Sequence, residues 1–472
     1  MESSPESRVP AQAPPGVRPA DRSEPRPPGA AVRRHRRALQ LCFGIPGLAL
    51  ATWVTRTPDV RDRLHASTAE MGLVLFGMSI GSMLGILAAG ALVARFSTRP
   101  VIITGMGLVL ASSGTTALGA ALSSAPLVAF GLLLIGAGVG LSEVASNVDG
   151  ADVERAYGRP VLPALHGCYS LGTLIGAALG AGGAAIGLPV PWHLAAVLLV
   201  TAVLFARALP GLRPGLGRAT GAGAGAGASA SASASASAGT AGGAATGPDA
   251  PVPGRAPAAV AAVAADRRPY LDPRLLLIGG VVFAMTLAEG SATDWLPLLM
   301  VDGHDMPAGL GSLVYAGFAA TMAAGRFAGG PVVARLGRPL VLGGGALLTA
   351  AGIALVSLVD SPAAAGCAVL LWGLGTALGF PLALSAAGES GPDTTARIAL
   401  TSRIGYVALL AGPPTLGFLG EHHGLRAAML PVLLLALAAA ALSPSTATRT
   451  PAPSPAPVPS PVPAPAPVGD ET

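Results

Sequence analysis

Two polar residues stand one helical turn apart inside a long apolar run and are the first candidates for chemistry. The run begins near Leu127, and it contains Glu143 and, four residues later, Asn147. Residues at this spacing share one face of a helix. A carboxylate inside a membrane helix costs roughly 2.5–3.5 kcal/mol on insertion scales, so it marks a functional site unless it reaches water or pairs with a cation near the helix end. We expect Glu143 and Asn147 to face a central cavity, where burial favours the neutral acid and Glu143 carries a proton.

Two more charged residues stand deep in other apolar runs. Glu289 lies fifteen residues after Arg274, about 22 Å along a helix axis, which predicts a position near the middle of a membrane. Arg326 lies nine residues before Arg335, about 13 Å from the helix end and too deep for its side chain to reach water easily. We therefore expect Arg326 to pair with an acid or to bind an anionic group. Glu289 is expected to bind solute and protons or to form a structural ion pair.

Three further candidates each have a structural alternative. Asp294 is expected near the outer mouth of the cavity, where it would bind solute or form an ion pair. His166 would be a proton relay or a hydrogen-bonded packing residue. Arg403 would bind solute or extend its charged end towards the membrane surface. Three tryptophans would stack on a substrate ring or anchor helices at the membrane surface, and these are Trp53, Trp295 and Trp372.

The composition indicates the class of protein to which these residues belong. Of 472 residues, 51% are hydrophobic and 11% are charged, whereas soluble domains carry about 25% charged residues. The chain is therefore predicted to cross a membrane many times. Its net charge of +5 does not indicate nucleic-acid binding, because the basic residues other than histidine are all arginine and lie in short loops and at the ends of the apolar runs.

Other kinds of chemistry find no support in the sequence. It contains no P-loop, no paired metal ligands and no nucleophile elbow, so neither an enzyme nor a cofactor is predicted. The three cysteines fall within apolar runs and have no disulfide or metal spacing.

The expected partners are lipid, protons and a small-molecule substrate, and the protein is expected to be a monomer.

Twelve apolar runs are long enough to span about 30 Å of hydrocarbon. Six precede and six follow a break rich in Gly, Ala, Ser and Pro, which predicts an all-α membrane protein with twelve transmembrane helices in two six-helix bundles, at 38–210 and 270–443. The linker 211–269 and the tails 1–37 and 444–472 are predicted to be disordered. The runs are 38–57, 72–94, 101–121, 127–147, 162–187, 190–209, 274–300, 310–334, 339–359, 363–387, 397–420 and 424–443.

The two halves repeat each other, which makes the two bundles pseudo-symmetric. Gly90 to Arg95, followed by Arg99, corresponds to Gly330 to Arg335, followed by Arg338. A parallel six-plus-six duplication is the layout of transporters with a binding site near the middle of the membrane. Arginines concentrate in alternate loops, so the positive-inside rule places both termini and the linker in the cytoplasm. The Ala-, Gly- and Pro-rich composition is typical of a GC-rich bacterial genome, which predicts a bacterial inner membrane.

The repeat also predicts a cytoplasmic gate. Aligning Gly136 on Gly373 places Asp152 on Glu389, and each of these acids follows a helix end beside the arginine loop of its own half. Two ion pairs are expected to form while the cytoplasmic side is closed, namely Arg95 with Asp152 and Arg335 with Glu389. The alternative is that these arginines only set the topology.

These motifs make the chain resemble the major facilitator superfamily over essentially all of 38–443. The loop motif of that superfamily stands here as Gly90 to Arg99 and Gly330 to Arg338, with Ala94 and Ala334 in place of the usual acid. The stretch Glu143-Val-Ala-Ser-Asn147 resembles E-T-A-A-N in the fourth helix of fucose–proton symporters, and the chain looks like a related branch of bacterial inner-membrane permeases.

The sequence differs from two patterns of that superfamily. The first run offers Thr52 and Trp53, where fucose symporters also use an acid. The glycines of the antiporter motif are present at Gly172 and Gly176, but Ala177 replaces its proline. The resemblance and the buried acids together predict a secondary transporter that works by alternating access and takes up a small, sugar-like polar solute with protons. The alternatives are a proton-driven exporter of hydrophobic compounds and a non-transporting membrane receptor.

Overall fold

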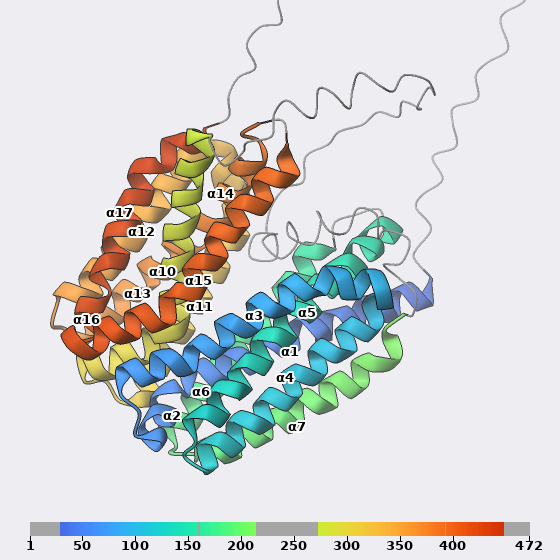
Figure 1. Ribbon diagram of the computed structural model, residues 1–472, viewed down its shortest axis with the longest axis horizontal. Helices are drawn as coiled ribbons and strands as arrows, with labels where there is room; N and C mark the ends of the chain where they lie inside the picture. The colour runs from blue at the N-terminus through green and yellow to red at the C-terminus, as the bar shows by residue number, and fades with distance from the viewer. Residues whose placement is uncertain (1–28, 158–160, 214–271, 392, 448–472) are drawn as a thin grey trace, which may run out of the picture.

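Two bundles of long helices make up the described part of the chain, which in this computed structural model comprises residues 29–157, 161–213, 272–391 and 393–447 (Figure 1). The N-terminal bundle contains α1 (Ala30–Thr55), α2 (Thr57–Leu64), α3 (Thr68–Phe96), α4 (Thr98–Ala121), α5 (Ala125–Tyr157), α6 (Leu162–Ala185) and α7 (Val190–Ala208), and ends with the 3-10 turn η1 (Leu209–Gly211). The C-terminal bundle contains α10 (Pro273–His304), α11 (Ala308–Leu336), α12 (Arg338–Leu358), α13 (Pro362–Thr376), α14 (Gly379–Gly388), α15 (Thr394–His423), α16 (Leu425–Ala428), α17 (Leu430–Leu442) and the 3-10 turn η3 (Ser443–Thr446).

The helices agree with the predicted membrane spans. In the described ranges, 11 helical segments are long and apolar enough to cross a membrane, and each coincides with a predicted run. The remaining run, 397–420, forms α15, which has 30 residues but lower hydropathy because Arg397, Arg403 and several small polar residues interrupt it. Its length and its packing against α3 and α10 place it with the spanning helices. The all-helical fold of two six-helix bundles is confirmed.

The first helix begins earlier than the hydropathy predicts. Residues 30–37 were expected to belong to the disordered tail, but α1 begins at Ala30. His35 is 1% exposed, its Nε2 lies 3.2 Å from Asp149 Oδ2 of α5, and its Nδ1 lies 3.2 Å from the carbonyl oxygen of Gly211. These contacts hold a polar segment in the bundle, and a scan for apolar runs does not detect them. The rest of that tail, most of the linker and the residues from 448 lie outside the described residues.

The C-terminal boundary also differs from the predicted one. The tail was expected to be unanchored from Pro444, but η3 continues the fold to Thr446. Nε of Arg274, at the start of α10, donates a hydrogen bond of 2.9 Å to the carbonyl oxygen of Ser445, and Nη2 donates to that of Ala447. An arginine at the start of one helix therefore satisfies carbonyl groups at the end of another.

Glycines bring equivalent helix pairs together in the two halves. A Cβ atom on Gly136 of α5 would collide with the backbone of Met78 on α3, and one on Gly373 of α13 would meet the carbonyl oxygen of Phe318 on α11 at 2.5 Å. Only glycine permits such close approach of two helix backbones. The matching contacts support the predicted alignment of Gly136 on Gly373.

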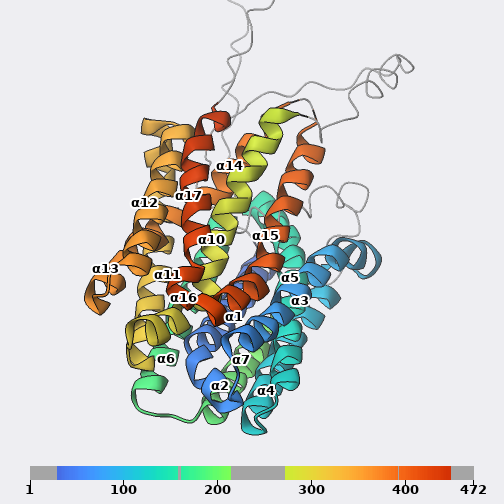
Figure 2. The same ribbon diagram turned by 60° about the vertical axis from the view of Figure 1, so that its left-hand side comes forward.

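The two bundles meet at one end, here called the closed end, and diverge towards the other, the open end, where α1 begins and α5 ends (Figures 1 and 2). At the closed end, a Cβ on Gly417 of α15 would lie 2.9 Å from Cα of Gly72 on α3. Ser312 Oγ of α11 donates a hydrogen bond of 2.6 Å to the carbonyl oxygen of Thr55, the last residue of α1. Arg61 of α2 forms an ion pair with Asp302 of α10.

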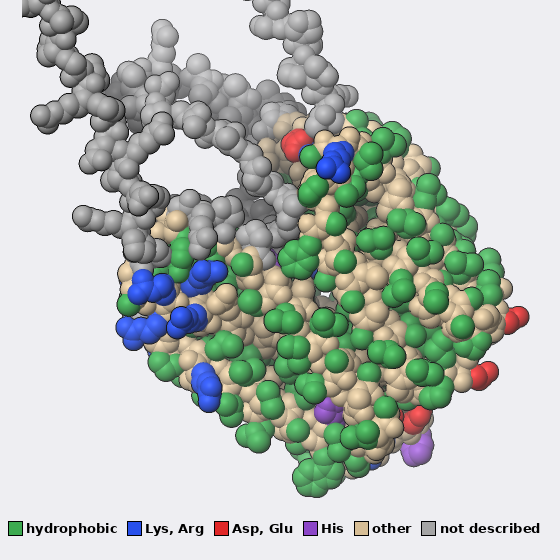
Figure 3. Space-filling view, turned by 180° about the vertical axis from the view of Figure 1, so that it is seen from behind, with side chains coloured by type: hydrophobic (Ala, Val, Ile, Leu, Met, Phe, Trp, Pro, Cys, Tyr) green, Lys and Arg blue, Asp and Glu red, His purple; other side chains and the backbone are tan. Residues whose placement is uncertain are grey.

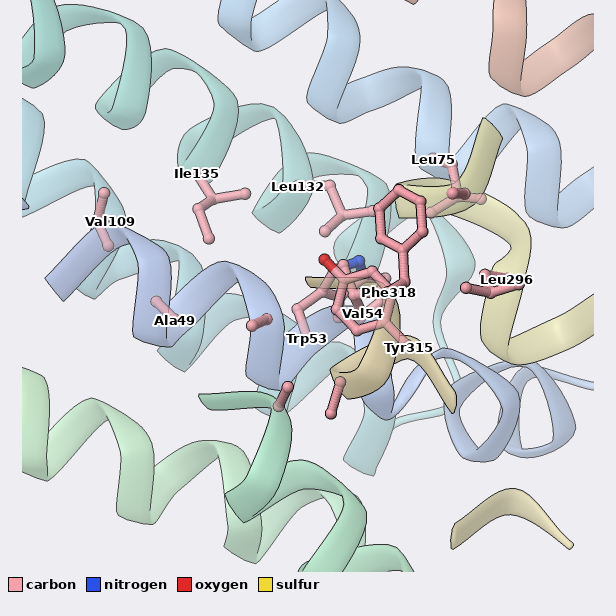
Figure 4. Close-up of a cluster of buried hydrophobic side chains, with 14 of the residues drawn as sticks. Ala49, Trp53, Val54, Leu75, Val109, Leu132, Ile135, Leu296, Tyr315 and Phe318 are labelled. Atoms are coloured by element: carbon pink, nitrogen blue, oxygen red, sulfur yellow. The ribbon is translucent and has the colours of Figure 1, made fainter. Parts of the chain in front are cut away.

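Apolar side chains from both bundles fill the space behind these contacts. Trp53 of α1 and Leu132 of α5 lie close to Tyr315 and Phe318 of α11 in one buried cluster (Figure 4). Each of these four side chains is at most 4% exposed. The closed end is therefore sealed by backbone contacts, polar bonds and a packed apolar cluster.

Candidate substrate cavity

A cavity of about 290 Å³ lies between the two bundles. Its N-terminal wall comes mainly from α3 and α5 and is largely apolar, with Met78, Met83, Ile86, Ile135 and Val139. Its C-terminal wall comes from α10, α14 and α15 and is more polar, with Thr286, Glu289, Thr293, Asp294 and Tyr406. The two walls therefore offer different chemistry to one bound molecule.

Arg326 and Glu289 form an ion pair beside this cavity. Nη2 of Arg326 on α11 donates a hydrogen bond of 2.8 Å to Glu289 Oε1 on α10. Glu289 lines the large cavity, whereas Arg326 lines a neighbouring cavity of about 80 Å³ that also includes Glu289. Of the two expected roles of Arg326, pairing with an acid is the one that the structure contains.

The same arginine also contacts a break in a helix. The run 363–387 was expected to be one helix, but it divides into α13 and α14 at Ala377 and Leu378. Pro381 has no N–H, so the carbonyl oxygen of Ala377, four residues earlier, loses its helical partner. Nε of Arg326 donates to that oxygen at 3.4 Å. Arg326 thus links Glu289 to the point where the helix is broken.

Replacing Pro381 with alanine should restore the missing N–H. We expect Pro381→Ala to straighten the junction of α13 and α14 and to raise the thermal stability slightly, because the Ala377 carbonyl regains a helical hydrogen bond. Transport should slow, since Nε of Arg326 loses its acceptor. Amide hydrogen exchange at residues 376–382 measures the first effect, and unchanged exchange in that segment would contradict the explanation.

Glu143 and Asn147 lie on α5 beyond the cavity, in the direction of the open end. Glu143 is one turn past the cavity-lining Val139 and interacts electrostatically with Arg326, but neither Glu143 nor Asn147 lines either cavity in this conformation, so their role at the cavity stays a prediction. It has no hydrogen bond or ion pair to any residue that the structure describes. Asn147 is 5% exposed, and both of its amide atoms lack a hydrogen-bond partner among the described residues. Buried polar groups of this kind are usually satisfied by water or a ligand.

The remaining candidates are placed differently from one another. Asp294 lines the cavity and is 7% exposed, one turn beyond Gly290 along α10 towards the closed end. His166 packs edge-on against Phe43 of α1, with ring centroids 4.8 Å apart. Arg403 is exposed, one turn before the exposed Val407 of α15, and it lines neither cavity. Its position favours extension towards the membrane surface.

The three tryptophans do not take either of their expected places. Trp53, Trp295 and Trp372 are at most 3% exposed and line neither cavity, so they neither stack on a bound ring nor anchor a helix at the surface. Nε1 of Trp372 donates a hydrogen bond of 3.1 Å to the carbonyl oxygen of Ala288, one residue before Glu289. All three tryptophans are core residues, and Trp372 holds α13 to α10 next to Glu289.

Three tyrosines at the cavities were not singled out from the sequence. Tyr169 and Tyr406 line the large cavity, and Tyr169 and Tyr315 line the small one. The hydroxyl group of Tyr406 is buried without a hydrogen-bond partner among the described residues. A signal was available, because the chain has only 5 tyrosines and three of them interrupt apolar runs. A tyrosine inside a membrane helix needs a polar partner for its hydroxyl group.

The acids of the expected gate have other partners in this conformation. Asp152 pairs with Arg155, three residues along α5, rather than with Arg95. Glu389 pairs through both carboxylate oxygens with Arg338, at 2.7 and 3.0 Å, rather than with Arg335. The hydrogen bonds from Arg338 lower the pKa of Glu389 below its usual value. The predicted pairs belong to the state that is closed on this side, so the gate stays a prediction.

Two pseudo-symmetric bundles of membrane-spanning helices around a shared cavity are the architecture of secondary transporters. A family model described as Major Facilitator Superfamily matches residues 38–402. The chain belongs to this superfamily.

Its relatives and structural neighbours fit that assignment. The chain is 30% identical over 404 residues to an uncharacterized MFS-type transporter of Yersinia pestis, covering 84% of this chain and 91% of the relative. It is 25% identical over 405 residues to the membrane protein MosC of Rhizobium meliloti, covering 84% and 86%. The nucleoside transporter NupG has a similar structure, with a TM-score of 0.62 at 13% identity over 89% of this chain and 98% of NupG. The transporter FucP in its outward conformation gives a TM-score of 0.54 at 16% identity over 87% and 99%. At these identities the two structures show a common fold.

Proposed function

We propose that this membrane transporter couples the uptake of a small, sugar-like polar solute to protons by alternating access. The observation that carries the proposal is a cavity shared by both bundles, with the carboxyl groups of Glu289 and Asp294 in its wall, that described residues seal at the closed end. Such a site can be exposed to one side of the membrane at a time when the bundles rock against each other.

The polar groups at the cavity divide into two roles. Glu143 is the proton carrier, because it faces the interior without a fixed partner and its neutral form is the one that burial favours. Asn147, Glu289 and Asp294 bind the solute, with Arg326 positioning Glu289 through their ion pair. His166 has a packing contact with Phe43 and is assigned no proton transfer.

The charge distribution supports an orientation in a bacterial inner membrane. Figure 3 shows arginines gathered near the open end, where Arg37, Arg95 and Arg207 are exposed, and most of the acidic side chains of this view towards the closed end. The arginines of the closed end, among them Arg56, Arg61 and Arg426, are paired with acids. The positive-inside rule then places the open end and both termini in the cytoplasm. With this proposed orientation, the open end faces the cytoplasm and the conformation is inward-open, and we propose that the transporter works as a monomer.

Glu143→Gln tests the coupling. In liposomes, the variant should exchange solute across the membrane at a rate near that of the parent but should not accumulate it in response to a pH gradient, because glutamine cannot release a proton. Glu70→Gln is the matched control, since glutamine can replace Glu70 in the capping box at the start of α3. Accumulation by Glu143→Gln equal to that of the parent would transfer the role to another group, with Glu289 first.

The apolar wall of α3 and α5 favours a second function, the proton-driven export of hydrophobic compounds. Met78, Met83 and Ile135 would contact an apolar molecule over much of its surface. A deletion strain separates the two functions. Lost growth on one carbon source with unchanged drug tolerance indicates uptake, and the reverse pattern indicates export.

A further inference from the structure

Asp294 is a buried acid without a partner. Its side chain is 7% exposed and lines the large cavity, and it has no hydrogen bond or ion pair to any residue in the described ranges. Burying a carboxyl group in this way is costly unless another group neutralises or hydrogen-bonds it. The position therefore requires an occupant, which is either a proton or a cation.

Neither Arg326 nor Arg403 pairs with Asp294. Arg326 is committed to Glu289 and lines the smaller cavity rather than the larger one. Arg403 lines neither cavity. Glu143, on the opposite bundle, adds a further carboxyl group without a partner. The described groups around the large cavity therefore include more carboxyl groups than guanidinium groups.

Two other features of the cavity fit the body of an organic cation. Tyr169 and Tyr406 line the same space, and aromatic rings attract ammonium groups through their faces. Across from Asp294, the apolar side chains of Met78 and Ile135 can pack against the carbon skeleton of a small molecule. An anion would meet the charge of Asp294 without compensation, and a neutral solute fits only the protonated acid, whereas an ammonium group pairs with the carboxylate itself.

We propose that the transported solute is a small organic cation whose ammonium group pairs with Asp294 while its carbon skeleton lies against the apolar wall of α3 and α5. This substrate class rests on the proposed transport function and narrows its polar solute to an aminated one. Glu143 remains the proton carrier, so the solute and the proton occupy different carboxyl groups.

Matched pairs of small molecules test, on the intact parent protein, whether the solute is a cation. Each pair has one cation and one neutral molecule of similar shape: glucosamine with glucose, 4-aminocyclohexanol with cyclohexane-1,4-diol, and choline with 3,3-dimethyl-1-butanol. In thermal unfolding of the purified protein at pH 7, the cation of at least one pair should raise the Tm by about 2 °C or more and its neutral partner by less. If no cation exceeds its neutral partner in any pair, the inference is overturned.

Substitutions at Asp294 test whether this residue is the one that recognises the cation. Asp294→Asn should weaken binding of the preferred cation at least tenfold and so remove its advantage over the neutral partner, whereas Asp294→Glu should retain the preference. Asp360→Asn is the matched control, because Asp360 is 93% exposed and pairs with Arg426 in a loop. A cation preference that survives Asp294→Asn in folded protein overturns the assignment to this residue.

Failure of the proposed substrate class can be distinguished from failure of the proposed transport function. Uptake of a neutral probe driven by a pH gradient, without any cation preference, would refute the substrate class and leave coupling intact. Cation binding together with uptake that is indifferent to a protonophore would support the class and refute coupling.

Discussion

Gly417→Leu is expected to abolish transport by holding the closed end apart. A Cβ at this position would lie 2.9 Å from Cα of Gly72 and 2.9 Å from the carbonyl oxygen of Thr68, both in the backbone of α3. Backbone atoms cannot rotate out of the way, so the bundles must separate. Overpacking costs about 1–3 kcal/mol, which is enough to move a two-state equilibrium by roughly one to two orders of magnitude. A cysteine reporter in the cavity should become accessible from the closed end.

A second glycine provides the control for this experiment. Gly344 lies in α12, and a Cβ there would have nothing within 4 Å. Gly344→Leu should therefore leave both transport and reporter accessibility close to those of the parent. If Gly417→Leu transports like Gly344→Leu, the contact between α3 and α15 is not what closes this end.

Arg326→Met is expected to cause the largest loss of both stability and transport among substitutions at the cavity. It removes the partner of Glu289 and one donor to the Ala377 carbonyl at the same time. Leaving buried polar groups without partners costs about 1–3 kcal/mol, and more where the group is charged. Thermal unfolding of the purified variant and uptake by liposomes measure the two losses.

A double variant distinguishes the cost of leaving the Glu289 carboxylate unpaired from the loss of the directed contacts of Arg326. Adding Glu289→Gln to Arg326→Met should recover part of the stability, because the unpaired carboxylate is gone, but it should not recover transport. Arg326→Lys should also fall short, since an ammonium group cannot reproduce the two directed contacts of a guanidinium. Full stability in Arg326→Met alone would show that the ion pair does not hold α10 to α11.

Hydropathy predicted the spanning helices because their signal is local. Each run of about 20 apolar residues identifies one helix without any knowledge of its neighbours. The break at Ala377 was missed because Pro381 stands in a run that is otherwise apolar and long enough to be one helix. The helical start of α1 was missed because His35 is held by Asp149, far away in the sequence.

Some of the residues at the cavity could also be predicted, because their signal is local in the sequence. A charged residue inside an apolar run is conspicuous, so Glu143, Glu289, Asp294 and Arg326 could be found from the sequence. Which acid Arg326 binds depends on how α10 and α11 pack, and the sequence left this open. The tyrosines escaped notice because a single hydroxyl group hardly changes the hydropathy of a helix.

The transition between the two conformations of the transporter should have a heat-capacity change, because the apolar cluster at the closed end is buried in one conformation and exposed in the other. When this end opens, aromatic and aliphatic side chains such as Trp53 and Phe318 become hydrated, and exposing apolar surface raises the heat capacity. The contribution of this cluster to closure weakens on cooling. The populations of the two states should thus follow a curved van't Hoff plot, with cold favouring the state that is open to the other side.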